Sequence, residues 1–200
     1  MPQEVTITIH RLSELDDDVQ ETLIDEYVDV LIKKDNWWRS EIGRILKIGK
    51  RMGIDLDRDG INFDLCSNTI SLNGIYSYAK GSSAAIRKMT LDETVHEIVD
   101  SLTRSQSRRF YTVRVVLNSD GSRETTYSVT SRGEEVSAEV EPYSDIVSSL
   151  GNFASWAYKC LLEKYEDSTH RDVIRGTLET HHYFTRDGQI VTDVVKSLVL

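Results

Sequence analysis

The sequence predicts one α+β domain, residues 1–200, in which mainly antiparallel sheet packs with about six helices. Three observations support this class. Stretches with helical or strand periodicity arrive in blocks and do not alternate strictly along the chain. The 200 residues, of which 39% are hydrophobic, suffice to bury a core without disulfides. Two prolines, Pro2 and Pro142, are the only ones in the chain, and no low-complexity linker divides it.

The N-terminal residues predict a strand followed by a helix. Residues 5–9 alternate apolar and polar side chains, as a half-buried strand does. Ser13 and Asp16 have the spacing of a capping box, so we expect a helix to begin there. Its apolar positions recur at helical spacing and are Leu15, Val19, Leu23, Tyr27, Val30 and Leu31.

A second helix should begin at Asn36 and end at Gly53, because glycine commonly follows the last turn of a helix. Its apolar stripe consists of Trp38, Ile42, Ile45, Gly49 and Met52. The short connection at residues 33–35 predicts that the two helices are antiparallel neighbours.

The rest of the chain predicts strands and helices in blocks of two or three. In order, these are strands at 61–66 and 69–78, helices at 81–90 and 90–104, a meander of strands at 110–117, 124–130 and 134–140, a long helix from Pro142, a helix at 171–180 and a hairpin at 183–190. Asn73–Gly74 favours a turn or bulge, whereas Arg132–Gly133 and residues 186–188 favour turns.

Composition excludes several classes of protein. No run of about 18 apolar residues occurs, so no segment is expected to span a membrane. The N-terminus lacks the positive and apolar regions of a secretory signal. Cys66 and Cys160 are far apart in sequence, which favours reduced thiols over a disulfide framework. We therefore expect a cytoplasmic protein.

The net charge of −9 is distributed unevenly. Residues 1–35 carry ten acidic and three basic side chains, and residues 134–167 carry eight and two. Residues 36–53 carry five basic side chains and one acidic one. The overall acidity makes nucleic acid an unlikely partner, although it leaves room for a local basic patch.

Asp55, Asp57 and Asp59, followed by Gly60, have the pattern that opens a calcium-binding loop. Alternate carboxylates supply the several oxygens that this hard cation requires. However, Cys66 stands where such a loop needs a bidentate glutamate, and a strand is predicted next where a helix normally follows. The alternative is a solvent-exposed turn, so we expect no cofactor unless calcium binds at these aspartates.

The other catalytic motifs are incomplete. His96–Glu97 lacks the second histidine of a zinc-protease helix, because Asp100 occupies that position. Lys80–Gly81 lacks the upstream glycine spacing of a phosphate-binding loop. His181 and His182 are adjacent and would point to opposite faces of a strand. The sequence therefore favours a protein that is not an enzyme, with a site assembled from distant residues as the alternative.

Three charged groups of residues are candidates for partner binding. Arg44, Lys47 and Arg51 fall on one face of the second predicted helix. The alternative to partner binding is that they form ion pairs with the acidic first helix. Asp16, Asp17 and Asp18 fall in the first turns of that first helix, where its dipole favours negative charge. A further cluster at residues 104–111 combines basic side chains with aromatic rings, as surfaces that bind single-stranded nucleic acid do. The alternative is that these aromatic rings enter the core.

The tryptophan pair Trp37–Trp38 is unusual. Consecutive helical residues lie about 100° apart, so one ring can enter the core while the other stays near its edge. Trp38 fits the apolar stripe, which makes Trp37 the candidate for partial exposure and for contact with a partner. The alternative is that both rings pack under neighbouring strands.

Several stretches, in this order along the chain, resemble a widespread family of uncharacterised tailed-bacteriophage accessory proteins, sometimes labelled antitoxin-like. They include Asn36-Trp37-Trp38, residues 74–81 (GIYSYAKG), residues 108–111 (RRFY), residues 153–158 (FASWAY) and residues 184–188 (FTRDG). The chain differs from the family at residues 67–73, where members carry a loop similar to Gln-Gly-Asp-Gly. The resemblance implies a viral setting and an accessory role.

These observations lead to three hypotheses for function. The first is a non-enzymatic phage accessory protein in the host cytoplasm that binds and inhibits, or redirects, a host protein such as an antiviral-defence component. The second is an acidic DNA mimic that uses residues 16–29 and 134–145 to inhibit a DNA-handling protein. The third is an enzyme or metal-binding protein whose dispersed site includes Asp55, Asp57 and Asp59.

Overall fold

The computed structural model describes residues 8–33, 37–107, 113–119 and 124–192. The chain divides into two compact units: unit 1 combines Met1–Trp38 with Lys164–Leu200, and unit 2 is Arg39–Glu163. The second boundary falls inside the long helix α5 (Tyr143–Thr169). A boundary inside a continuous helix has no linker composition, which explains why the sequence contains no sign of it.

The described part of unit 2 contains a five-stranded antiparallel sheet with its strands in sequence order. These strands are β1 (Ile54–Asp64), β2 (Thr69–Ser77), β3 (Val113–Asn118), β4 (Thr126–Ser131) and β5 (Glu134–Val136). Together with the helices in blocks between them, they confirm the predicted α+β class and the predicted order of elements. The Arg132–Gly133 turn is also confirmed, with positive φ at both residues.

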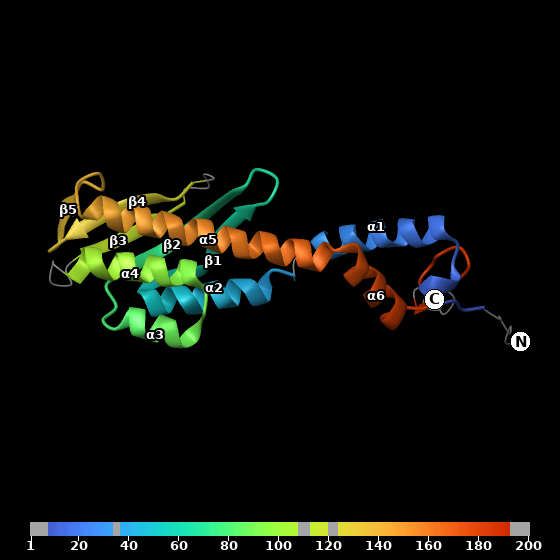
Figure 1. Ribbon diagram of the computed structural model, residues 1–200. Helices are drawn as coiled ribbons and strands as arrows, with labels where there is room; N and C mark the ends of the chain where they lie inside the picture. The colour runs from blue at the N-terminus through green and yellow to red at the C-terminus, as the bar shows by residue number, and fades with distance from the viewer. Residues whose placement is uncertain (1–7, 34–36, 108–112, 120–123, 193–200) are drawn as a thin grey trace, which may run out of the picture. The chain divides into compact units, whose positions relative to one another are not determined.

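Helices cover one face of this sheet. They are α2 (Arg39–Met52), α4 (Glu93–Ser107) and the part of α5 that belongs to unit 2, while α3 (Ser82–Met89) packs against α2 and α4. Figure 1 shows α2, α4 and α5 on the same side of the strands. Along β3, Val113, Val115 and Leu117 are buried, whereas the alternating Arg114 and Asn118 are exposed. This alternation is typical of an antiparallel sheet with one covered and one open face.

Most predicted helical stripes form the core. Along α2, the buried residues are Ile42, Ile45, Ile48, Gly49 and Met52. Along α5, they include Ile146, Leu150, Phe153, Ala157, Cys160 and Leu161, which recur at helical spacing in the sequence, and also Trp156. Leu91 stands four residues before the buried Val95, at helical spacing, but it precedes α4 and is 91% exposed.

Strand β1 corrects the expected turn at Asp59–Gly60. The strand begins at Ile54, and the chain continues through both residues in the strand without reversing. Its register against β2 shifts between Leu56, which pairs with Gly74, and Ile61, which pairs with Leu72. Residues 57–60 therefore form a bulge opposite Asn73. A Cβ at Gly60 would lie 2.7 Å from the Asn73 Cβ, so this close approach requires glycine.

Unit 1 has its own small core. Its main described elements are a short 3₁₀ turn (Leu12–Glu14), α1 (Asp17–Lys33), the end of α5 and α6 (Arg171–His181). The buried residues are Leu12, Leu15, Ile24, Ile174, Leu178 and Phe184. Phe184 forms isolated antiparallel bridges with His10 and Ile190, and the second of these confirms the predicted C-terminal hairpin.

The predicted capping box at Ser13 is wrong. Helix α1 begins at Asp17, and the Asp16 carbonyl accepts the first helical hydrogen bonds. The Ser13 amide and hydroxyl instead donate to the carboxylate of Glu179 on α6, both at 2.9 Å. A partner distant in sequence has therefore replaced the local one that the spacing suggests.

Several predicted features lie outside the described residues. They are the strand start at residues 5–7, the cap Asn36 and the cluster residues 108–111.

Gly53 at the end of α2 is expected to tolerate no side chain. Its φ is +93°, and a Cβ there would overlap the carbonyl oxygen of Ser77. We expect Gly53→Ala to lower the free energy of unfolding by about 1–3 kcal/mol, the usual cost of backbone strain. Gly43 is the control, because it is an exposed α2 residue and a Cβ added to it would have nothing within 4 Å. Gly43→Ala should be neutral or stabilising by up to about 1 kcal/mol. Urea unfolding of both variants measures the difference, and equal effects would contradict this account.

Candidate functional site

A groove of about 810 Å³ runs along unit 2 between α4 and α5. Its walls carry polar and charged side chains at helical spacing, namely Thr94, Glu97, Ser101 and Arg104 on α4 and Asn152, Ser155, Lys159 and Glu163 on α5. Its apolar lining comes from Ile98 and Trp156. A 2.9 Å hydrogen bond from Ser149 Oγ to Ser101 Oγ connects the two helices. The groove thus has a fixed apolar base between two polar walls.

Arg44 of α2 reaches this groove and is held there by three contacts. Its Nε donates to Glu41 Oε1 at 2.6 Å, and its Nη2 donates to Cys160 Sγ at 2.9 Å. Its guanidinium carbon lies 5.2 Å from the centroid of the Trp156 ring, a cation–π distance. Partial burial lowers the pKa of Arg44, but the bond to Glu41 and the other contacts together raise it more, so the side chain stays charged.

Asp92 joins the two walls. Its Oδ2 accepts a 2.8 Å hydrogen bond from the Trp156 indole nitrogen. Its Oδ1 accepts a 3.3 Å bond from the Val95 amide, which makes Asp92 the N-terminal cap of α4. Neither Asp92 nor Trp156 is among the site residues that the sequence predicts. An aspartate just before an apolar helical repeat is a recognised cap signal, but nothing in the sequence indicates that the same carboxylate binds an indole.

Cys160 lies in the groove as a neutral thiol. Burial raises its pKa to about 11, although the nearby Arg44 acts in the opposite direction. A nucleophilic cysteine needs the reverse shift, because the thiolate is the reactive form. The geometry therefore makes Cys160 an acceptor that positions Arg44.

Of the three basic residues predicted on α2, Arg44 lines the groove, and Lys47 and Arg51 are exposed and do not line it. Trp37 precedes α2 and is not helical, contrary to the expectation for the tryptophan pair. It is partly buried, with its ring 5.5 Å from that of Tyr165 in an edge-on contact.

The acidic residues of α1 are partly paired within unit 1. Arg171 of α6 binds Glu21 and Asp25, and Arg175 binds Glu21. These pairs reduce the acidic face that the sequence indicates for a DNA mimic. Asp16, Asp17 and Asp18 are exposed at the start of the helix. Asp18 also lines a smaller groove of about 480 Å³ with Glu26 and Asp187.

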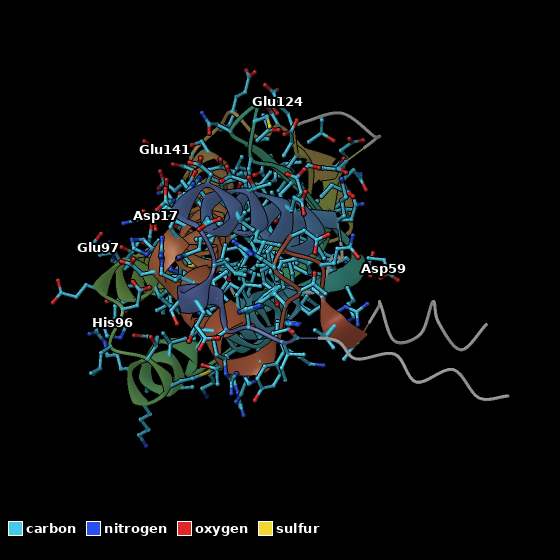
Figure 2. All side chains as sticks on the ribbon, turned by 90° about the vertical axis from the view of Figure 1, so that its right-hand side faces the viewer. Asp17, Asp59, His96, Glu97, Glu124 and Glu141 are labelled. Atoms are coloured by element: carbon cyan, nitrogen blue, oxygen red, sulfur yellow. The ribbon has the colours of Figure 1, made fainter. Side chains whose placement is uncertain are left out.

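Asp55, Asp57 and Asp59 occupy alternate positions of β1, and all three are exposed. His96 and Glu97 lie on α4, on the other side of unit 2 from Asp59 (Figure 2). His96 Nε2 lies 2.9 Å from the Thr90 carbonyl oxygen, and Asp100 binds Ser83 and Arg87. Within the described ranges, no three His, Cys, Asp or Glu side chains are grouped as a metal site requires. In the same part of the chain, no helix has the length and hydropathy to cross a membrane.

We expect the two cysteines to differ in reactivity. Cys66 is exposed and Cys160 is buried. With a pKa of about 11, Cys160 is ionised to roughly one part in a thousand at pH 8. Titration of the native protein with a disulfide reagent should therefore label Cys66 rapidly, and Cys160 should react only after denaturant unfolds the protein. Cys66→Ser should remove the rapid phase. Rapid labelling of two thiols in the native protein would contradict the burial of Cys160.

The three aspartates of β1 are expected not to hold calcium. Calcium binds its oxygens at about 2.3–2.6 Å, and these three carboxylates are not grouped closely enough in the described structure to share one ion. A ligand of the native state raises the unfolding midpoint. We therefore expect the same midpoint in millimolar calcium and in EDTA. A calcium-dependent rise that Asp57→Asn abolishes would contradict this expectation.

The comparisons with known proteins identify a family without a described activity. Neither a curated protein sequence nor a solved structure matches the chain. Residues 37–171 match the family described as a domain of unknown function, DUF8835. This match includes α2 and all five strands of unit 2, as well as both helices that form the groove. Because it covers more than half of the sequence, the chain belongs to the DUF8835 family.

Proposed function

We propose that this protein works by binding a partner protein, and that the groove between α4 and α5 receives a segment of that partner. The resemblance to tailed-bacteriophage accessory proteins makes a host protein in the cytoplasm the expected partner. Inhibition or redirection of that host protein is then the expected effect.

The observation that carries this proposal is that the groove combines an aromatic side chain held in place by hydrogen bonding with exposed polar side chains on both helices. Trp156 is held by Asp92 and lies beneath Arg44, so the base of the groove is ordered before anything binds. Thr94, Glu97 and Asn152 are exposed on the walls and available to a ligand. A preformed site of this kind loses less entropy on binding than a mobile one.

Leu91 adds apolar area beside these polar groups. It is 91% exposed and directly precedes Asp92, which lines the groove. Protein interfaces commonly combine an apolar centre with a polar rim, and burial of an exposed leucine contributes about 1.5–3 kcal/mol. The exposed leucine therefore suits a protein partner better than a small polar ligand.

The chemistry of the groove also favours binding over catalysis. Cys160 is a neutral thiol engaged with Arg44, and the two carboxylate oxygens of Asp92 each accept a hydrogen bond. A general base or nucleophile needs a pKa suited to proton transfer and access to the substrate. Burial raises the pKa of Cys160 to about 11, and the oxygens of Asp92 are already engaged by Trp156 and Val95.

A matched pair of arginine substitutions tests the groove. Ser155 is exposed on the α5 wall, and Ala84 is exposed on α3 away from the groove. We expect Ser155→Arg to block the groove and to reduce capture of the partner from host lysate at least about tenfold, the effect of losing roughly 1.4 kcal/mol of binding. Ala84→Arg adds the same charge to a helix and should leave capture unchanged. The measurement is quantitative mass spectrometry of proteins retained on the immobilised chain.

Two results would contradict the proposal. If the wild-type chain retains no host protein above background, the binding role fails. If Ser155→Arg and Ala84→Arg retain the partner equally, the groove is not the binding surface. Thermal unfolding of both variants checks that each is folded.

A further inference from the structure

We infer that Arg44 forms a carboxylate-binding subsite within the α4–α5 groove, and that the partner segment presents an aspartate or glutamate side chain to it. This inference rests on the proposed function and specifies the chemistry of the partner.

The guanidinium of Arg44 is held in place by two hydrogen bonds and still has N–H donors that bond to no described residue. Nε is bonded to Glu41, and one N–H of Nη2 is bonded to Cys160. Among the described residues, Nη1 has no partner, and a guanidinium carries five N–H donors in all. The Arg44 side chain is 42% exposed and lines the groove. Donors therefore remain for a ligand that enters the groove.

The surroundings of Arg44 favour binding of an anion. The bonds to Glu41 and Cys160 and the Trp156 ring already fix the side chain, so little conformational entropy is left to lose. The planar fork of arginine matches the two oxygens of a carboxylate, and such charge-assisted bonds are about twice as strong as neutral ones. The aromatic ring also shields one side of the guanidinium from water.

The charges of the groove favour a single carboxylate over a phosphate. The acidic residues Asp92, Glu97 and Glu163 line the groove beside the basic residues Arg44, Arg104 and Lys159, so the lining has no net charge, and Lys159 Nζ lies 3.7 Å from Glu163 Oε1. This balanced lining offers no excess positive charge for a doubly charged phosphate, whereas a single carboxylate needs only Arg44. Glu97 is exposed and has no ion pair among the described residues, so a basic residue in the partner segment would find a partner there. We therefore expect a segment of mixed charge.

A nuclear magnetic resonance titration of the full chain tests the subsite. The signals to follow are the Arg44 Nε–H and the Trp156 indole N–H, which belong to the guanidinium and the ring that it lies over. The probes are acetyl-Gly-Glu-Gly-amide, its glutamine counterpart acetyl-Gly-Gln-Gly-amide, and inorganic phosphate. We expect the glutamate peptide to shift both signals saturably, with at least tenfold higher affinity than the glutamine peptide.

Substitutions of arginine by lysine provide the matched control. Arg44→Lys keeps the positive charge but loses the planar, forked guanidinium, so it should lower the affinity for the glutamate peptide at least tenfold. Arg51 lies on the same helix, is exposed and does not line the groove. Arg51→Lys should therefore leave the affinity unchanged. The wild-type titration stands on its own if Arg44→Lys fails to fold.

The outcomes separate this inference from the proposed function. Equal shifts with both peptides, or none, overturn the carboxylate subsite, and tighter binding of phosphate at the same signals replaces it with a phosphate site. If Ser155→Arg still loses the captured partner in those cases, the groove remains the binding surface. If Ser155→Arg retains the partner, the proposed function fails, and the inference fails with it.

Discussion

The contact between Asp92 and Trp156 organises the functional half of this protein. One carboxylate caps α4 through Val95 and holds the indole of α5 through its other oxygen. The same indole lies beneath Arg44, which in turn binds Glu41 on its own helix and Cys160 on α5. Three helices are thus connected through one polar chain at the surface of a hydrophobic core. Trp156 is buried, so its indole N–H would be costly to leave without a partner, and Asp92 supplies that partner.

The network also explains why a cysteine near an arginine does not signal catalysis here. Proximity of a cation normally lowers the pKa of a thiol. At Cys160 burial has the larger effect on the pKa, and the nearby Glu41 raises the pKa further. The same pair of residue types can therefore build either a nucleophile or an anchor, and the depth of burial decides which.

Much of the fold could be predicted from the sequence because its elements follow simple periodicities. The stripe of α2, the wide apolar face of α5 and the meander of β3 to β5 all follow from local patterns. The predictions fail where a distant partner replaces a local one, and where a helix begins later than its apolar repeat suggests. Ser13 bonds Glu179 and caps no helix, and Leu91 is exposed because Asp92 begins the next helix. The site shows the same limit. Arg44 is a candidate by charge, but only the folded structure brings Trp156, Asp92 and Cys160 to it.

The aspartates of β1 have a further consequence that concerns other copies of the chain. In the described sheet β1 has a partner on one side only, so its outer edge presents unpaired amides and carbonyls. Such an edge can recruit a strand from another molecule and begin aggregation. The bulge at residues 57–60 interrupts the regular edge, and three exposed carboxylates repel an identical strand. The pattern that resembles an ion-binding loop thus fits a protective role, because it discourages the sheet from growing beyond its own chain.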